Sequence, residues 1–494
     1  MINRTFLTMI CVTQMYLAFA PNFLPNDPSA PIKKNSQYPN IVYILADDLG
    51  IGDLGCYGQQ IIKTPNIDKI AAQGILFTNH YSGSTVCAPS RCALMTGQHT
   101  GHTSIRDNVG GVGISGGEGQ LPMDANSITI AELLKQKGYA TGAFGKWGLG
   151  FIGTSGDPNK QGFDEFFGYN CQAMAHRFYP EYLWHNDKKV FLPGNNWTNK
   201  VTYSADVIHN KAIQFIEKNA NKPFFLYYPT TIAHAELIVP NDEIFKRHLG
   251  KYVEVPIALE KGGAYGPDID IKAYFPQENP KATYAAMVER LDRHVGEVMA
   301  KLKELGIEKN TLIVFSSDNG VNREAGIDPE FFNSNSLFRG SKRDLYDGGI
   351  KTPMVAMWPA KIKAGTTTNH LSAFWDVFPT ISEIVQEKTP KNVDGISFLP
   401  TLLALKNQKS HEYLYWEFHS INGRQAIRKG KWKAVRLNVL IKAKTTTELY
   451  DLDEDPSETI NLATKYPEKV KEMELLMEKS HTETQLFPFI TNIK

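Results

Sequence analysis

Apolar runs of strand length alternate along this chain with segments of helical spacing. Residues 40–46 form a continuous apolar run, and largely apolar runs recur at 224–228 and 311–317. Runs that are apolar at successive positions are typical of strands that a parallel sheet buries on both faces. Helical spacing is found at 66–73, after Pro89, at 129–138, at 203–219 and at 281–305, and shorter strands are predicted at 75–77 and 139–144.

The pattern changes after about residue 395. Alternating strands and helices before this point predict an α/β fold, with a large, mostly parallel sheet sandwiched by helices over residues 40–394. The remainder, 395–494, predicts a smaller α+β C-terminal subdomain. Its short β-like pieces lie at 413–418, 424–428, 431–435 and 448–450, and a closing helix lies near 464–480.

The N-terminus has the features of a secretory signal. Arg4 precedes an uncharged, largely apolar stretch that ends in small residues, so we expect a signal peptide over residues 1–20. Pro21 is a poor neighbour for cleavage, which leaves the cut site open. A lipid anchor at Cys11 is a weaker alternative because small residues do not precede that cysteine. We therefore expect an exported protein, periplasmic or secreted.

Five prolines in residues 21–39 predict a linker between the signal and the fold. No later run is long and apolar enough to predict stable insertion in a membrane.

Composition excludes some classes of function. The 494 residues include 53 basic and 52 acidic side chains, a near balance that argues against nucleic-acid binding. A hydrophobic content of 42% supplies a sizeable core and excludes a disordered scaffold. Five cysteines are too few for a disulfide framework in a chain of this length, although a single Cys56–Cys171 bridge is left open.

Three of the predicted strands are followed by polar side chains. Asp47 and Asp48 follow the first, His234 comes shortly after the second, and Asp318 and Asn319 follow the third. Ligands of parallel sheets bind beyond the carboxyl ends of the strands, so we expect these groups to converge. Their oxygen atoms suit a hard cation, Ca²⁺ or Mg²⁺. The alternative is that these residues serve only in turns and helix caps.

Residues 84–97 contain a second candidate site. Pro89 fits the first turn of a helix, which would put Cys87 just before the helix N-terminus, where the dipole favours an anion. Arg91 lies four residues later and can point toward the same place. The alternative is a buried structural cysteine beside a surface arginine.

These motifs resemble those of type I sulfatases, the formylglycine-dependent members of the alkaline-phosphatase superfamily. The signature is Cys87-Ala88-Pro89-Ser90-Arg91, and the likeness runs in order from about residue 40 to 465. It implies an alkaline-phosphatase-like fold and hydrolysis of sulfate esters. Further matches are Ala46-Asp47-Asp48-Leu49-Gly50, Gly52-Asp53, Thr64-Pro65-Asn66-Ile67-Asp68, Gly145-Lys146-Trp147, Ser317-Asp318-Asn319-Gly320, Arg339-Gly340-Ser341-Lys342, Tyr346-Asp347-Gly348-Gly349-Ile350, Glu448-Leu449-Tyr450-Asp451-Leu452, Asp455-Pro456 and Asn461-Leu462.

The resemblance also implies roles for individual residues. Cys87 would be oxidised to formylglycine by a formylglycine-generating enzyme, and the hydrated aldehyde would attack sulfur. Arg91 would stabilise that hydrate, and His234 would protonate the leaving oxygen. The residues around the sulfate would be Lys146, His234 and Lys342, and the calcium ligands would be Asp47, Asp48, Cys87 (as formylglycine), Asp318 and Asn319.

The chain departs from the family pattern at two positions. A histidine commonly follows Gly-Lys-Trp in the family and helps to deprotonate the hydrate, but Gly148 stands there. We therefore expect either a substitute base, with His99 and His102 as candidates, or slower turnover. Ala233 precedes His234 where many relatives have proline, which makes the role of His234 less secure.

The substrate is less clearly marked. Residues 172–184 mix aromatic, His and Arg side chains that suit a sugar, although a packed irregular segment explains them equally well. The resemblance suggests a sulfated carbohydrate as substrate, with galactose or N-acetylgalactosamine sulfates as candidates. Rival interpretations are a phosphonate or phosphate ester hydrolase and a sulfated-glycan binding protein that has lost turnover. Candidate substrate contacts are His176, Arg177, Asn322, Arg323 and Arg343.

Overall fold

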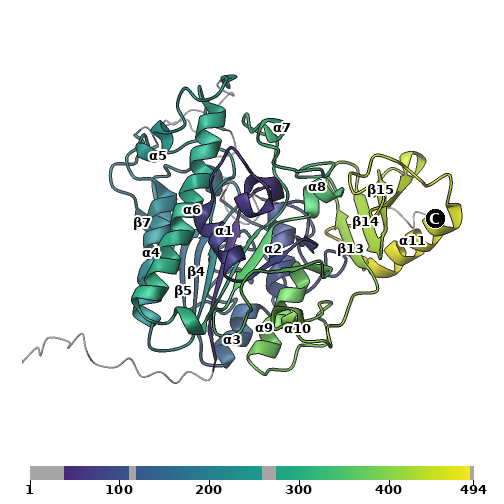
Figure 1. Ribbon diagram of the computed structural model, residues 1–494, viewed down its shortest axis with the longest axis horizontal. Coiled ribbons are helices and arrows are strands. Elements are labelled where there is room, and N and C mark those ends of the chain that lie inside the picture. The colour runs from purple at the N-terminus through teal and green to yellow at the C-terminus, as the bar shows by residue number, and fades with distance from the viewer. Residues whose placement is uncertain (1–37, 111–117, 198, 259–273, 490–494) are drawn as a thin grey trace, which may run out of the picture. The chain divides into compact units, whose positions relative to one another are not determined.

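The computed structural model describes residues 38–110, 118–197, 199–258 and 274–489 (Figure 1). The predicted signal over 1–20, Cys11 and nearly all of the linker lie outside these ranges. Within them, no helix combines the length and the apolar character needed to cross a bilayer. The helices are α1 Pro65–Ala72, α2 Cys87–Thr96, α3 Ile130–Gln136, α4 Ser204–Asn219, α5 Glu243–Lys246, α6 Pro280–Glu304, α7 Pro329–Phe332, α8 Asp347–Ile350, α9 Val377–Ile384, α10 Leu399–Leu402 and α11 Pro467–Ser480.

A ten-stranded sheet is the centre of the fold, with strand order β11-β2-β10-β9-β1-β8-β4-β5-β6-β7. Its middle strands β9, β1, β8, β4 and β5 are parallel, whereas β10, β6 and β7 pair antiparallel. The ten strands are β1 Asn40–Ala46, β2 Ile75–Phe77, β4 Ala140–Lys146, β5 Glu165–Tyr169, β6 Tyr182–His185, β7 Lys188–Phe191, β8 Phe224–Pro229, β9 Thr311–Ser317, β10 Met354–Met357 and β11 Thr366–Thr368.

Both faces of this sheet are buried, which explains the continuous apolar run of β1. Val42 and Ile44 pack into a core with α1, α4 and α6, while Ile41 and Tyr43 pack into the opposite core with α2, α3 and α9. Figure 1 shows α4 and α6 side by side on their face of the sheet. Successive side chains of a strand point to opposite faces, so a strand covered on both sides is apolar throughout.

A second, four-stranded antiparallel sheet follows in the chain, drawn in yellow-green in Figure 1. Its order is β13-β14-β15-β16, and α11 packs on it through Met473 and Met477. The predicted α/β class with a smaller α+β part is confirmed. Because residues 36–494 form one compact unit, the boundary between residues 394 and 395 stays a prediction. The remaining strands are β3 His80–Tyr81, β12 Ser372–Ala373, β13 Leu414–Phe418, β14 Arg424–Lys429, β15 Trp432–Leu437 and β16 Thr446–Asp451.

The disulfide that the sequence left open does not form. Cys56 and Cys171 are both free, as are Cys87 and Cys92. Cys171 is buried and its Sγ accepts the backbone N–H of Met174 at 3.4 Å. The thiols of Cys56 and Cys171 are therefore part of the packing and do not cross-link the chain.

Candidate active site

Four neighbouring strands of the large sheet end at one edge and bring the predicted polar residues together. In the register, Ala46 at the end of β1 pairs with Ser317 at the end of β9, so Asp47 and Asp318 follow side by side. The backbone N–H of Asp48 donates to Asp318 Oδ1 at 3.1 Å. Strand β8 leads to His234 and β4 ends in Lys146. The convergence predicted from the strand ends is therefore present.

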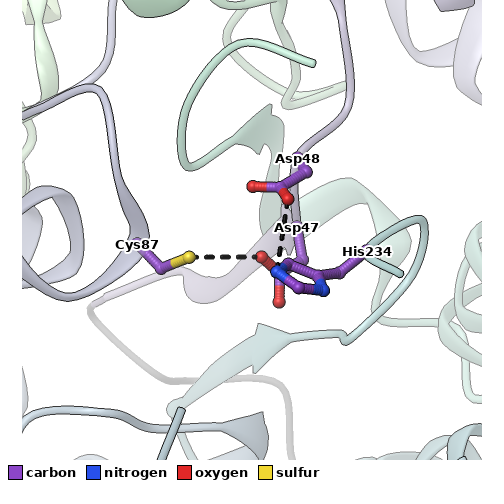
Figure 2. A group of neighbouring side chains, drawn as sticks. All are labelled: Asp47, Asp48, Cys87 and His234. Carbon is purple, nitrogen blue, oxygen red and sulfur yellow. Dashed lines mark hydrogen bonds and ion pairs between the residues drawn. The ribbon is translucent and has the colours of Figure 1, made fainter. Parts of the chain in front are cut away.

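Cys87 is the first residue of α2 and points at this edge (Figure 2). Its side chain is only 1% exposed; Sγ donates to Asp47 Oδ1 at 3.7 Å and accepts from Lys146 Nζ at 3.4 Å. Burial raises the pKa of the thiol to about 12, although Lys146 opposes this shift. The unmodified thiol is therefore protonated at neutral pH and is a poor nucleophile.

Arg91 lies one turn further along α2, fully buried beneath the carboxylates. Its guanidinium donates to Asp318 Oδ2 through Nε at 3.0 Å and through a terminal nitrogen at 2.8 Å. A further N–H donates to the Lys146 carbonyl, and Asp47 lies 3.5 Å away. Arg91 thus fixes the relative positions of β1, β4 and β9 at the site and is not the surface residue of the alternative interpretation.

Lys342, His234 and Asp48 form the other side of the site. Lys342 Nζ donates to Asp48 Oδ2 at 2.7 Å and lies 3.0 Å from His234 Nε2, which is itself 3.3 Å from Asp48. Nδ1 of His234 contacts the carbonyl of Ala235, so Nε2 is the ring atom that faces the site. Burial and Lys342 lower the pKa of His234 to about 4, which makes the ring neutral at pH 7.

The carboxylates differ in their electrostatic environment. Burial alone would raise the pKa of Asp47 and of Asp48, but the surrounding cations together outweigh it, led by Lys146 and Lys342, respectively, and hold both values below the usual range. Burial and the neighbouring Asp47 raise the pKa of Asp318 to about 6 despite Arg91. Like charges at this distance repel unless a cation lies among them.

The donor set fits a hard cation. One possible ligand atom of each of Asp47, Asp48, Cys87 and His234 lies within 4.8 Å of the others (Figure 2), and of these atoms the carboxylate oxygens are the ones that suit a hard cation. Asn319 Nδ2 donates to Asp48 Oδ1 at 2.7 Å, while its buried Oδ1 has no hydrogen-bond partner among the described residues. A buried amide oxygen without a donor costs free energy, and an oxygen-liganded cation would satisfy it.

Two predicted substrate contacts lie against the cluster. The ring of His176 stacks on that of His234, with centroids 4.7 Å apart and planes 13° from parallel. Asn322 is buried and its amide donates to Asp48 Oδ2. Asn322 therefore binds a carboxylate in this structure, and its contact with substrate stays a prediction.

The three predicted arginine contacts have partners within the chain. Arg343 pairs with Glu324 at 2.6 Å and its backbone N–H reaches Thr85, two residues before Cys87. Arg323 pairs with the exposed Glu330 at 2.5 Å. Arg177 is fully buried and pairs with Glu236 at 2.7 Å, so its side chain is held by a structural ion pair. Their contact with substrate stays a prediction.

The expectation that His99 or His102 replaces a base at Gly148 is wrong. Both follow the C-terminus of α2, whereas Cys87 begins that helix, and ten residues of α-helix span about 15 Å. His102 Nδ1 bonds Asp394 at 2.9 Å, and the His99 ring stacks on His102 at 4.2 Å between centroids. Sequence proximity to the signature was misleading because the helix carries these residues away from the site.

Asn170 is a polar residue of this region that sequence reasoning missed. It follows β5, and its carbonyl accepts the backbone N–H of Gly148 at 3.0 Å. Both polar atoms of its side chain are buried without a partner among the residues described. The rule that selected Asp47, a polar residue directly after a buried strand, did not reach Asn170 because no strand was predicted over 165–169.

Comparison with protein families and known proteins agrees with this geometry. A family model described as "Sulfatase" matches residues 39–387, and one described as "N-sulphoglucosamine sulphohydrolase, C-terminal" matches residues 337–485. The chain is 32% identical to an N-acetylgalactosamine-6-O-sulfatase of Bacteroides thetaiotaomicron, with 91% of this chain and 94% of that protein covered.

Solved structures are similar over nearly the whole chain. The complex of Ps i-CgsB with k-i-k-neocarrahexaose is 29% identical, with a TM-score of 0.72 and coverage of 92% of this chain and 95% of that one. A phosphonate monoester hydrolase of Agrobacterium radiobacter is 19% identical, with a TM-score of 0.62 over 90% of this chain and 96% of that one. The second likeness shows the fold alone.

Proposed function

Because the chain belongs to the sulfatase family, the sulfuric ester hydrolases, we propose that it releases sulfate from sulfated carbohydrates, with residue 87 as the nucleophile. The observation that carries the proposal is the position of Cys87, with Sγ 3.4 Å from Lys146 Nζ and 3.7 Å from Asp47 Oδ1. Galactose or N-acetylgalactosamine sulfates are the first candidates, since the Bacteroides relative is an N-acetylgalactosamine-6-O-sulfatase.

The nucleophile requires modification of Cys87. The pKa of about 12 leaves the thiol protonated, whereas formylglycine supplies a hydrated aldehyde that can attack sulfur. A formylglycine-generating enzyme is therefore a partner of this chain. Because Cys87 is 1% exposed, that enzyme has to act before the chain folds.

Calcium is the proposed cofactor. When bound it supplies positive charge that favours the deprotonated nucleophile and offsets the carboxylates. The residues that would hold it are Asp47, Asp48, Asp318, Asn319 and residue 87. The unpartnered Oδ1 of Asn319 and the all-oxygen side chains of the other ligands support this assignment.

The cationic residues would bind and neutralise the sulfate ester. Lys146 and Lys342 place their ammonium groups on Asp47 and Asp48, from which an anionic ester can draw them. His234 would first take up a proton at Nε2 and then donate it to the leaving oxygen, since Nδ1 is held by the Ala235 carbonyl. An anion bound beside the ring raises the pKa of His234 from about 4 toward the operating pH.

Export to the periplasm or the medium is also part of the proposal. It is supported by Arg4 and the apolar stretch that follows it in the sequence. The mature N-terminus of protein recovered from the periplasm and the medium tests this: export predicts loss of the first twenty or so residues. An intact N-terminus in the cytoplasm would contradict it.

Sulfate release from defined sulfated oligosaccharides tests the central proposal. Protein made with a formylglycine-generating enzyme, and checked by mass spectrometry at residue 87, should release sulfate that ion chromatography detects. Cys87→Ala should abolish release, while Cys56→Ala, at a free cysteine outside the site, should retain it. Matched phosphate and phosphonate esters belong in the panel. Cleavage of these alone, or tight glycan binding without release by modified protein, would refute a sulfatase.

A further inference from the structure

Gly148 and Gln172 share one space beside the active site. Gly148 follows Lys146 by two residues and has a φ of +75°, in the region that favours glycine. A Cβ at position 148 would lie only 1.8 Å from Gln172 Nε2. The side-chain amide of Gln172 therefore fills the volume that any side chain at position 148 would need.

The amide of Gln172 is buried but makes no hydrogen bond in the part of the chain that the structure describes. The residue is 8% exposed, and both Nε2 and Oε1 lack a partner. Its backbone is held in place, because its N–H donates to Gln120 Oε1 at 3.1 Å. Asn170, two residues earlier, also has two unpartnered side-chain atoms and is 1% exposed.

Four buried amide atoms without partners are unusual in so small a region. Buried polar groups in folded proteins are nearly always paired, and an unpaired donor or acceptor carries its full desolvation cost. Such atoms next to a catalytic centre are expected to be paired in the complex with substrate. Charges of both signs act on this region, since Glu118 and Lys146 act on Cys171, while Lys146, Lys342 and Asp48 act on His176.

We propose that Gln172 binds a hydroxyl group of the sugar that carries the sulfate, with Asn170 beside it. A carboxamide offers one acceptor and two donors, which matches a hydroxyl, itself both donor and acceptor. A sulfate oxygen only accepts and would leave Oε1 unpaired. The amide does not take up a proton at neutral pH, so Gln172 is a specificity residue and not a base. The inference rests on the proposed sulfatase function.

A cycle of enzyme and substrate changes tests the contact. The preferred sulfated sugar is compared with its monodeoxy analogues, each on the unchanged enzyme and on Gln172→Ala. Loss of a buried hydrogen bond predicts a kcat/KM about 10- to 100-fold lower for Gln172→Ala, mainly through KM. With the unchanged enzyme, one deoxy analogue should have a kcat/KM that is lower than that of the parent sugar by the same factor. With Gln172→Ala, that analogue and the parent sugar should have the same kcat/KM.

A second variant, at Gly148, tests the same contact by displacing the amide of Gln172. Gly148→Ala would place its Cβ where Nε2 now lies, so it should displace the amide and reproduce the loss, with no further loss in the double variant. The control is Gln425→Ala, a buried glutamine of β14 whose amide is bonded to Tyr415, which should leave kcat/KM unchanged.

The outcomes separate the two proposals. Losses in Gln172→Ala that are equal for the parent sugar and every analogue, or no loss at all, would overturn the contact while sulfate release by the unchanged enzyme upholds the sulfatase. If modified, unchanged protein releases no sulfate from any sugar, the proposed function fails and the contact fails with it.

Discussion

The side chain of Arg91 contacts two carboxylates of the site, Asp47 and Asp318, and the Lys146 carbonyl at the end of β4. It is fully buried, and its guanidinium makes two bonds to Asp318 and one to the Lys146 carbonyl. A lysine ammonium cannot reproduce this planar fork. We expect Arg91→Lys to lower kcat at least 10-fold and Arg91→Ala to reduce the free energy of unfolding by about 3–5 kcal/mol, because Asp318 loses the cation with which it is paired.

Sulfate-release kinetics and urea unfolding measure these two effects. Arg247→Lys is the matched control, since Arg247 is more than half exposed in an ion pair with Glu289, and such pairs are worth about 0–1 kcal/mol. Equal effects at the two positions would show that burial of the Arg91 network does not matter.

Removal of calcium should be visible in stability as well as in activity. Without the cation, Asp47, Asp48 and Asp318 repel one another, so a chelator should lower the unfolding temperature by several degrees, as loss of a bound ligand does. Calcium should restore it. The unfolding temperature is also measured on Cys87→Ala, which has no turnover, so that a shift there reports stability alone. Asn319→Ala should raise the calcium concentration that is needed to restore the unfolding temperature. An unfolding temperature that is indifferent to chelator and calcium would exclude a bound cation.

Among single residues, sequence analysis identified the site residues that directly follow a predicted strand. Asp47 and Asp318 follow buried strands directly, and their convergence needs only the parallel sheet. Sequence analysis could not predict side-chain contacts between distant segments: nothing in the sequence indicated that Arg177 pairs with Glu236, which lies 59 residues away. Likewise, the place of Gln172 depends on the absence of a side chain at Gly148.

Between elements, Asp206 joins α4 to α6. It lies in the first turn of α4 and accepts from Arg290 at 2.7 Å and from His294 at 2.9 Å, both on α6. Burial alone would raise its pKa, but His294 and Arg290 lower it to about 2. A depressed carboxyl pKa contributes stability above the unfolded value of about 4, and this is lost as the pH falls toward 2.

The difference in unfolding free energy between the unchanged protein and Asp206→Asn should therefore depend on pH. We expect about 1–2 kcal/mol near pH 6, shrinking steadily below pH 4, as measured by urea unfolding at several pH values. Glu243→Gln on α5, at an exposed ion pair with Lys246, should show little change. If the difference in unfolding free energy grew as the pH fell, folding would raise the pKa of Asp206 and not lower it.

Helices long enough to repeat their hydrophobic pattern over several turns were predicted closely. The helices expected at 203–219 and 281–305 are α4, Ser204–Asn219, and α6, Pro280–Glu304. Strands of the sheet edges, such as β6, β7 and β11, were not predicted because they are short and only partly buried. A short segment contains too few positions to establish a period, and its strand conformation depends on the neighbour with which it pairs.

For the whole molecule, buried charges connect the large sheet to the C-terminal one. Lys433 of β15 bonds Asp347 of α8 at 2.6 Å and Glu458 at 2.9 Å, with all three side chains at most 2% exposed. On β13, Glu417 pairs with Arg106 at 2.7 Å, and the Trp416 indole donates to the Ser82 carbonyl at 2.9 Å. Separating the sheets would leave these groups unpaired, so we expect the two sheets to unfold together.

Two probes of unfolding test this cooperativity in protein with unmodified Cys87. Tryptophan fluorescence follows the C-terminal sheet when the protein keeps only Trp416 and Trp432, with the other five tryptophans replaced by phenylalanine. Alkylation of Cys87, located by peptide mass spectrometry, follows the active-site edge of the large sheet. Their urea midpoints should coincide, and Lys433→Met should lower both by the same amount, equivalent to about 3–5 kcal/mol, because Glu458 loses its paired cation and Asp347 keeps only the more distant Lys351 and Arg428. Lys431→Met, at a pair in which the lysine is half exposed beside Asp451, should shift neither. If Lys433→Met moved the fluorescence midpoint alone, the C-terminal sheet would be an independent unit, and the predicted boundary at residue 395 would separate two folding domains.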